Sequence, residues 1–238
     1  MHSTTIPYLY DAIYRYKNYE GQARLIIEVL QELGTPEGAL LELACGTGRY
    51  LEYLECYDRF GVDLCQESLM YAALRNPSAQ LELGNMMAVS RDAPLFKRNQ
   101  FDVILGLFGA IGYVPPADLP LCLQGWLSLL SPDGVLVLEP WHFDPEEGEF
   151  KQFYSSAALM VRRNATVSVK DGWTNMDFTF LVDHANGQRE ELTSTERLYS
   201  HPANALETLI ASLGATIIQK RDSDFQEHGQ WYIQKDSP

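Results

Sequence analysis

The fold is decided by residues 39–50, which read ALLELACGTGRY. The short run Ala39–Leu43, apolar at every position but Glu42, is typical of a strand that is buried on both faces of a parallel sheet. Two glycines, Gly46 and Gly48, follow this run, and residues 49–57 have helix-like apolar spacing. A strand, a glycine turn and a helix in this order predict a βαβ unit. Its glycine turn is expected at the carboxyl edge of the sheet, where such folds bind ligands.

Beyond this segment, short apolar runs alternate with stretches of helical spacing. Strands are predicted at residues 39–43, 60–63, 80–83, 101–105, 134–139, 216–218 and 230–233. Helices are predicted, besides residues 49–57, at residues 19–33, 66–75, 117–130 and 202–213. Strands that alternate with helices build βαβ units with right-handed crossovers. The sequence therefore predicts an α/β fold with a doubly wound, mostly parallel seven-stranded sheet.

One segment interrupts this alternation. Three extended runs, at residues 158–162, 175–182 and 191–199, are separated by Asp171-Gly172 and Asn186-Gly187. Asp-Gly and Asn-Gly are strong hairpin signals, so these runs predict an antiparallel three-stranded meander. We therefore predict a cofactor-binding α/β domain with an N-terminal helical arm, and an inserted substrate lid. The predicted boundaries are 1–150 with 201–238 for the α/β domain, and 151–200 for the lid.

The composition is that of an ordinary globular protein, with 46% hydrophobic, 11% aromatic and 21% charged residues. The chain holds 18 Lys and Arg against 32 Asp and Glu, which gives a net charge of -14. This sign is unfavourable for binding phosphate backbones or anionic membrane surfaces. We expect neither nucleic acid nor a membrane among the partners.

The cysteines and the N-terminal residues bear on location. Cys45, Cys56, Cys65 and Cys122 form no CxxC pair, so neither a zinc site nor a disulfide framework is expected. Residues 1–22 lack the basic start and apolar stretch of a signal peptide, and no run approaches the ~20 apolar residues that span a bilayer. We expect a cytoplasmic protein that uses no metal and is neither secreted nor membrane-spanning.

The residues after the first three strands indicate the ligand. A dinucleotide-binding loop needs a third glycine where this chain has Leu51, which argues against NAD or FAD. Asp63, at the end of the second strand, has a carboxylate that can accept both hydroxyl hydrogens of a ribose. The turn Gly84-Asn85-Met86, after the third strand, offers an acceptor and a backbone N–H to adenine. These features together predict an adenosine ligand without a pyrophosphate.

Residues 39–140, with this order of motifs, resemble the class I S-adenosylmethionine-dependent methyltransferases. The resemblance implies S-adenosyl-L-methionine as cofactor. The cofactor-binding residues expected from it and from the motifs above are Tyr10, Tyr19, Glu42, Ala44, Cys45, Gly46, Gly48, Asp63, Leu64, Asn85, Met86 and Leu107. The chain departs from the family at two positions. Ala44 stands where the family most often has Gly, and Asn85 stands where it often has Asp.

A narrower resemblance lies outside this core. Leu9-Tyr10-Asp11, residues 107–113, residues 137–143 and the inserted meander are similar to the amino-sugar N,N-dimethyltransferases of deoxysugar biosynthesis. This similarity implies N-methylation of a small-molecule amine, such as that of a nucleotide-linked amino sugar. Two alternatives stay open. The chain could methylate an amino acid or a small carboxylate or hydroxyl metabolite, or it could be a non-catalytic adenosine-ligand binder.

Four residues are candidates for the chemistry. Tyr113 and His142 lie just past the ends of the fourth and fifth predicted strands, where either could act as a general base. The alternatives are a pocket wall for Tyr113 and a surface or capping residue for His142. Glu139 could be a helix or turn partner, but its carboxylate is costly to bury alone, and an ammonium substrate would supply a partner. Tyr14 belongs to a tyrosine-rich arm that either packs over the sheet or closes over the sulfonium and the amine.

The predicted lid carries candidates for substrate binding. Basic and acidic residues balance within residues 151–197, so the rest of the chain carries the negative charge. Arg162 and Arg197 are either solvated hairpin charges or binders of an anionic group such as a phosphate or carboxylate. For the assembly of the protein, the hypothesis is a homodimer.

Overall fold

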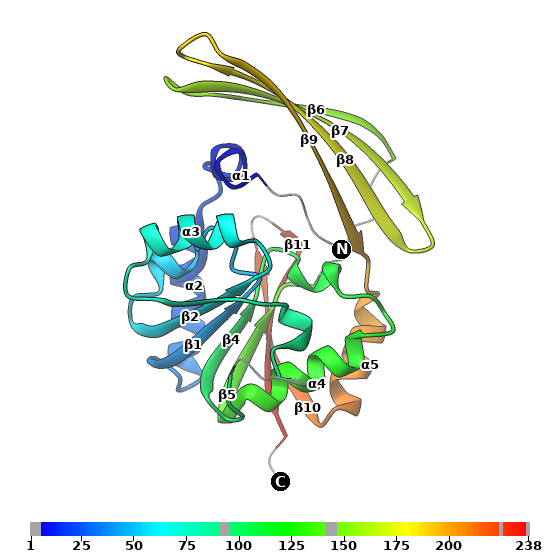
Figure 1. The fold of residues 1–238 in the computed structure, drawn as a ribbon. Coiled ribbons are helices and arrows are strands. Elements are labelled where there is room, and N and C mark those ends of the chain that lie inside the picture. The colour runs from blue at the N-terminus through cyan, green and yellow to red at the C-terminus, as the bar shows by residue number, and fades with distance from the viewer. Residues whose placement is uncertain (1–5, 91–95, 141–146, 224–225, 237–238) are drawn as a thin grey trace. The chain divides into compact units, whose positions relative to one another are not determined.

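The computed structural model describes residues 6–90, 96–140, 147–223 and 226–236 (Figure 1). The chain divides into two compact units. The first, here called the α/β unit, comprises Asn18–His142 and His201–Pro238. The second, here called the antiparallel unit, comprises Met1–Lys17 and Phe143–Ser200. The N-terminal arm, which we expected in the α/β domain, is thus grouped by its contacts with the antiparallel sheet.

The α/β unit is built on a seven-stranded sheet with the order β10-β11-β5-β4-β1-β2-β3 (Figure 1). The strands are β1 Gly38–Leu43, β2 Tyr57–Asp63, β3 Gln80–Leu83, β4 Phe101–Gly106, β5 Leu130–Leu138, β10 Ala215–Ser223 and β11 Gln226–Lys235. The pairs within β5-β4-β1-β2-β3 are parallel, and β11 is antiparallel to both β10 and β5. The predicted seven-stranded, mostly parallel sheet is confirmed.

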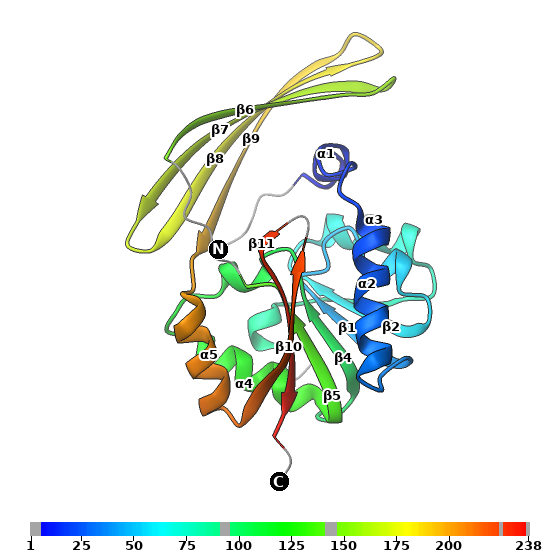
Figure 2. The ribbon, with the colours of Figure 1, turned by 180° about the vertical axis from the view of Figure 1, so that it is seen from behind.

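Helices cover both faces of this sheet. They are α2 Tyr19–Glu32, α3 Gln66–Arg75, α4 Leu119–Leu129 and α5 Ala203–Ser212, with the short 3-10 turns η1 Leu51–Tyr53, η2 Met86–Ala88 and η3 Ala110–Tyr113. Figure 1 has α4 in front of the sheet, whereas Figure 2, seen from behind, has α2 in front. No helix in the described residues is long and apolar enough to cross a membrane.

One predicted helix, at residues 49–57, is wrong. The chain makes only the single 3-10 turn η1 there, and β2 begins at Tyr57. The backbone N–H of Leu54 bonds to the carbonyl of Leu51, and that of Tyr57 bonds to the carbonyl of Leu54. Because both leucines are fully buried, their spacing of three serves two successive tight turns, which resembles the start of an amphipathic helix in the sequence.

The core is divided between the two faces of the sheet. Leu40, Val103 and Val137 pack with residues of α2, whereas their neighbours Leu41 and Leu136 pack with residues of α4 and α5. Successive side chains of a strand point to opposite faces, so the continuous apolar runs of the sequence supply both halves of the core.

The antiparallel unit contains the helix α1 Pro7–Ile13 and a four-stranded sheet. The strands are β6 Gly148–Ser155, β7 Leu159–Lys170, β8 Trp173–His184 and β9 Arg189–Tyr199, in the order β6-β7-β8-β9. The predicted three-stranded sheet is wrong, because β6 is a fourth strand. Seven of its eight residues are exposed and only Tyr154 is buried, so β6 lacks the alternating apolar pattern of a half-buried strand.

Local contacts explain the Asp171-Gly172 hairpin signal and the position of the arm on its sheet. Asp171 and Gly172 both have positive φ, 53° and 77°, as the tight turn between β7 and β8 requires. On one face of the sheet, Leu9 of α1 is buried together with Phe178 and Val182. The arm is therefore held to this sheet by an apolar cluster of its own.

Candidate functional site

Three motifs of the sequence meet at one edge of the α/β unit. The strands β3, β2 and β1 are consecutive neighbours and parallel, so their carboxyl ends lie in a row. The backbone N–H of Cys45 bonds to the carbonyl of Val62, and the backbone N–H of Gly84 bonds to the carbonyl of Asp63, both at 3.0 Å. The glycine loop, the acidic residue and the Gly84-Asn85-Met86 turn are therefore directly connected.

The glycine loop has a left-handed backbone at three positions. Ala44, Gly46 and Gly48 have φ of 52°, 53° and 71°. A Cβ built on Gly48 would lie 2.6 Å from the Asn76 amide nitrogen and 3.0 Å from the Ala72 Cβ, so this glycine allows close packing on α3. A Cβ built on Gly46 would meet nothing within 4 Å. Gly46 thus presents open backbone, to which a ligand can approach closely.

Asp63 ties the end of β2 to this loop. Its Oδ2 accepts a hydrogen bond from the Gly46 N–H at 2.8 Å, and its Oδ1 accepts one from the Cys65 N–H at 2.8 Å. Burial raises the pKa of Asp63, and the backbone N–H groups of Cys65, Gly46 and Leu64 oppose this rise. A carboxylate has about four acceptor positions, so these bonds leave capacity for the hydroxyls of a ribose.

The turn after β3 is also rigid. The Asn85 side chain caps η2 by accepting a hydrogen bond from the Met87 N–H at 2.9 Å, and the Met86 carbonyl accepts one from the Trp126 indole at 2.8 Å. The amide oxygen of Asn85 keeps a second lone pair, with which it could accept from an adenine amine. Leu64, after β2, is 46% exposed and offers an apolar surface at the same edge.

Ala44 and Cys45 take no part in proton transfer. The positive φ of Ala44 explains why glycine is common at this place in the family that the sequence resembles, since alanine is strained there. Burial, and then the charges of Glu42 and Asp63, raise the pKa of the Cys45 thiol well above its ordinary value. The thiol therefore stays protonated and unreactive.

A buried polar cluster lies next to the loop on the α2 face. Glu42 is 4% exposed and Tyr19 is 3% exposed. The Tyr19 ring packs edge-on against that of Tyr50 at 5.1 Å, and the Tyr50 hydroxyl donates to the Gln22 side chain at 2.6 Å. Burial raises the pKa of Tyr50 well above its ordinary value, and the charge of Glu139 adds to this effect.

Arg49 belongs to the same cluster and is a residue that the sequence reasoning missed. Its guanidinium carbon lies 4.8 Å from the centroid of the Tyr19 ring. The only signal in the sequence was its position directly after Gly48.

Glu139 follows β5 and is completely buried. One carboxylate oxygen accepts a hydrogen bond from the backbone N–H of Phe108, and the other accepts from the Gln230 amide at 3.1 Å. The Tyr232 hydroxyl in turn donates to the Gln230 amide oxygen at 3.0 Å. Phe108 and Gly109 both have positive φ, 53° and 71°. The carboxylate therefore holds a strained turn after β4.

This turn positions Tyr113. Leu107, which precedes it, is 5% exposed, and η3 begins directly after Gly109 and ends at Tyr113. Tyr113 itself is partly buried against the core. His142, the other candidate base, lies outside the described residues.

In the antiparallel unit, Tyr10 and Tyr14 pack ring against ring at 4.7 Å. The Tyr14 hydroxyl accepts a hydrogen bond from Arg163 at 3.2 Å, and the Arg163 guanidinium lies 5.1 Å from the Phe178 ring. Arg163 was not among the predicted site residues. Only its position next to Arg162 in the sequence could have indicated it.

The two predicted substrate-binding arginines differ in their surroundings. Arg162 forms an ion pair with Asp183 at 3.3 Å, and Asp183 also pairs with Arg189 at 2.9 Å. Arg197 instead stacks on Trp173, with 4.4 Å from the guanidinium carbon to the ring centroid. Its Nε–H is buried and has no hydrogen-bond acceptor in the described part of the chain.

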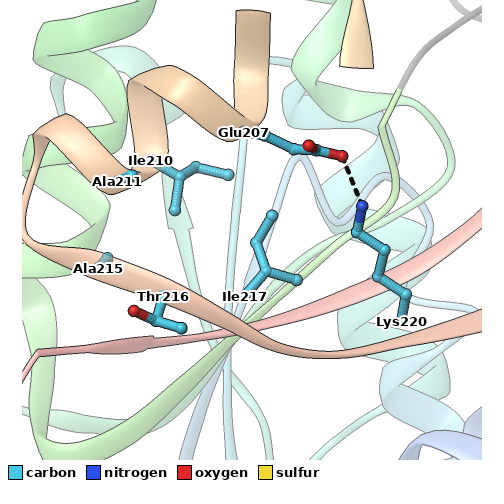
Figure 3. Close-up of a pocket in the computed structure, with 7 residues that line it drawn as sticks. All are labelled: Glu207, Ile210, Ala211, Ala215, Thr216, Ile217 and Lys220. Atoms are coloured by element: carbon cyan, nitrogen blue, oxygen red, sulfur yellow. Dashed lines mark hydrogen bonds and ion pairs between the residues drawn. The ribbon is translucent and has the colours of Figure 1, made fainter. Parts of the chain in front are cut away.

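A shallow hollow lies elsewhere on the α/β unit, between α5 and the first half of β10 (Figure 3). It is lined by Glu207, Ile210, Ala211, Ala215, Thr216, Ile217 and Lys220. Glu207 and Lys220 form an ion pair at 2.5 Å across it. Because Ala215 pairs with Lys235 at the far end of β11, the hollow is remote from the glycine loop. In the described ranges, no cluster of His, Cys, Asp or Glu could hold a metal ion.

The sequence matches known methyltransferases. A methyltransferase domain family matches residues 40–134. The dTDP-3-amino-3,4,6-trideoxy-alpha-D-glucopyranose N,N-dimethyltransferase of Streptomyces venezuelae is 33% identical over 193 residues, which are 76% of this chain and 78% of that enzyme.

Two solved structures share the fold over nearly the whole chain. DesVI from Streptomyces venezuelae superposes with a TM-score of 0.83 at 22% identity and covers 97% of both chains. The cofactor-bound structure of CalS10, an amino pentose methyltransferase from Micromonospora echinaspora, superposes with a TM-score of 0.79 at 23% identity. It covers 98% of this chain and 99% of that one.

Proposed function

Since the chain belongs to the S-adenosylmethionine-dependent methyltransferases, in the group of the amino-sugar N,N-dimethyltransferases, we propose that it methylates the amine of a nucleotide-linked amino sugar. The observation that carries the proposal is the similarity to the Streptomyces venezuelae enzyme over most of both chains. It is supported by the connection of the glycine loop to Asp63 in the α/β unit. Of the alternatives, a non-catalytic binder is excluded by the family, which is enzymatic.

The cofactor is S-adenosylmethionine, and when bound it supplies a methyl group that its sulfonium makes electrophilic. The residues that line the carboxyl edge fit this group. The open backbone at Gly46 admits close approach, Asp63 has acceptor capacity for ribose hydroxyls, and the turn at Asn85 and Met86 can face adenine. We propose that Tyr19, Glu42, Leu64 and Leu107 complete the cofactor site within the α/β unit. Tyr10, which belongs to the antiparallel unit, remains a cofactor-binding candidate from the sequence.

The protein has two tasks in this reaction. It must hold the acceptor nitrogen in line with the bond that breaks, and it must keep water away. The nitrogen attacks only as a neutral amine, so its proton has to leave to water or to a base. Tyr113 is our candidate among the described residues, because Glu139 fixes the turn from which η3 starts. His142 and Tyr14 remain candidates from the sequence.

The nucleotide part of the substrate requires a partner for negative charge. Arg197 suits this role better than Arg162, because Arg162 already pairs with Asp183. The guanidinium of Arg197 is held by the Trp173 ring, and its buried Nε–H lacks an acceptor in the described part of the chain. A planar guanidinium binds phosphate oxygens with two parallel hydrogen bonds. We therefore propose Arg197 as the main contact to the diphosphate.

The experiment is a comparison of acceptors. The purified enzyme is incubated with radiolabelled cofactor and, in parallel, with a nucleotide-linked amino sugar, the same sugar nucleotide with a hydroxyl in place of the amine, a free amino sugar and an amino acid. We expect transfer to the nucleotide-linked amine and little to the others. Preferential transfer to the hydroxyl analogue or to the amino acid would contradict the proposed substrate.

Location and assembly are secondary proposals. All four cysteines are free thiols, and of these only Cys56 is exposed. Free thiols are typical of a reducing compartment, which supports a cytoplasmic location. The homodimer stays a proposal that light scattering on the purified protein can test.

A further inference from the structure

We propose that Arg49 binds the carboxylate of the methionine part of the cofactor, an inference that rests on the cofactor site of the proposed function. The guanidinium lies beside the glycine loop, at the end of the site where this carboxylate is expected, and it forms no ion pair with an acidic side chain of the described residues.

The order of the strands gives the direction in which the cofactor lies. Asn85 follows β3, Asp63 ends β2 and Gly46 follows β1, so the residue proposed for adenine, the residue proposed for ribose and the glycine loop form a row in that order. Adjacent strands lie about 4.8 Å apart, a spacing that matches successive parts of an extended ligand. The methionine end therefore lies beyond the glycine loop, where Arg49 follows Gly48 directly.

Arg49 has an unsatisfied donor at this place. Its Nε–H is buried and has no acceptor in the described part of the chain. The chain carries 32 acidic side chains, yet no ion pair of Arg49 with any of them is formed within the described ranges. A buried donor without an acceptor is unfavourable, and a carboxylate from a ligand would remove this cost.

The guanidinium is also held in place before any ligand arrives. It stacks 4.8 Å from the Tyr19 ring centroid, and that ring is fixed edge-on against Tyr50. Tyr19 is the first residue of α2, whose start is capped by the Asn18 side chain through the Gly21 N–H at 2.9 Å. An anion near this helix start is favoured by the helix dipole as well. A planar, preorganised guanidinium is suited to two parallel bonds with a carboxylate.

The test compares two ligands that differ in the group in question. S-adenosylhomocysteine carries adenosine and the amino acid, whereas 5′-methylthioadenosine lacks the amino acid. Calorimetry of Arg49→Ala should show affinity for S-adenosylhomocysteine reduced on the order of 10- to 100-fold, the range for losing a hydrogen bond between charged groups. The affinity for 5′-methylthioadenosine should be unchanged. Arg49→Lys keeps the charge but not the planar fork, and should give a smaller loss that is confined to S-adenosylhomocysteine.

Two controls separate this inference from other effects. Arg24→Ala removes the same charge from an exposed position of α2 and should change neither affinity. Asp63→Ala should weaken the binding of both ligands, because both contain the ribose. The inference would be overturned if Arg49→Ala bound both ligands with wild-type affinity. It would also be overturned if Arg49→Ala and Arg49→Lys each lost affinity for both ligands to the same extent. Neither ligand involves the acceptor, so a failure to methylate amino sugars would leave this result unaffected.

Discussion

The carboxylate of Asp63 accepts a hydrogen bond from the backbone N–H of Gly46 at 2.8 Å. The end of β2 therefore fixes the shape of the loop that follows β1, and the same carboxylate is placed beside the open backbone of that loop. One side chain thus serves both to build the cofactor site and, as we propose, to bind the ribose.

We predict that Asp63→Ala weakens cofactor binding by about 1–3 kcal/mol, because it leaves polar partners without an acceptor. Calorimetry with S-adenosylhomocysteine measures this directly. Asp58→Ala is the matched control, since Asp58 is an exposed aspartate of the same strand. This variant should bind the ligand with wild-type affinity. An unchanged dissociation constant for Asp63→Ala would rule out this assignment.

The same residue gives a pH dependence. Burial raises the pKa of Asp63, so its carboxylate becomes protonated at a higher pH than the ~3.9 of an exposed aspartate. Cofactor affinity should start to fall, on acidification, above that value, and Asp63→Asn should remove this acid limb. The effect on folding has the opposite sign. The folded state binds the proton more tightly, so this group disfavours folding at neutral pH and the penalty disappears on acidification.

Ala44→Gly should leave the protein as stable as the wild type or stabilise it by up to about 1 kcal/mol. Relief of the left-handed strain of alanine at φ 52° outweighs or balances the greater chain entropy of glycine in the unfolded state. The control is Ala39→Gly in β1, which has no positive φ and should lose roughly 0.5–1 kcal/mol. Urea unfolding compares the two. A loss for Ala44→Gly as large as that for Ala39→Gly would refute the strain at Ala44.

Glu139→Leu should destabilise the protein by about 3 kcal/mol, because the Phe108 N–H and the Gln230 amide lose their buried acceptor. Glu139→Gln keeps an acceptor for one of these donors and should cost less. Glu82→Gln, at an exposed position, serves as control and should stay within ~0.5 kcal/mol of the wild type. Full stability of Glu139→Leu together with lost turnover would instead support a direct contact between Glu139 and a substrate ammonium.

Arg197→Ala should raise the KM for the nucleotide-linked substrate by about 10- to 100-fold and leave cofactor affinity intact. Arg162→Ala should raise this KM less, because the exposed Arg162 side chain already forms an ion pair with Asp183. Steady-state kinetics with both variants tests the order. Equal loss of substrate and cofactor binding in Arg197→Ala would indicate damage to the fold rather than a lost phosphate contact.

The parts of the fold that were predictable are those in which burial or turn geometry restricts the residue types that the sequence can have. Ala39–Leu43 is apolar at every position but Glu42 because β1 is covered on both faces. Asp171-Gly172 marks its hairpin because the turn needs positive φ. β6 was not predictable in this way, since Tyr154 is its only buried side chain. The spacing of Leu51 and Leu54 gave a false helix, because successive 3-10 turns also place buried residues three apart.

The site was predictable where a strand end fixes a residue. Asp63 ends β2 and Gly46 follows the neighbouring parallel strand β1, so their approach is a consequence of the sheet. Arg49 was not predictable, because its stacking on Tyr19 depends on how α2 packs over the loop. The partners of Glu139 were equally hidden, since Phe108 lies in the turn after β4 and Gln230 lies on β11, the last strand.

The central claim is that this methyltransferase acts on the nitrogen of a nucleotide-linked amino sugar. The most direct test uses cofactor with an isotope-labelled methyl group and follows the label by nuclear magnetic resonance in the isolated sugar product. The account predicts that the labelled methyl is bonded to the sugar nitrogen, and that Asp63→Ala forms the same product more slowly. A label found on oxygen, or an amino sugar nucleotide recovered unmodified from active enzyme, would contradict it.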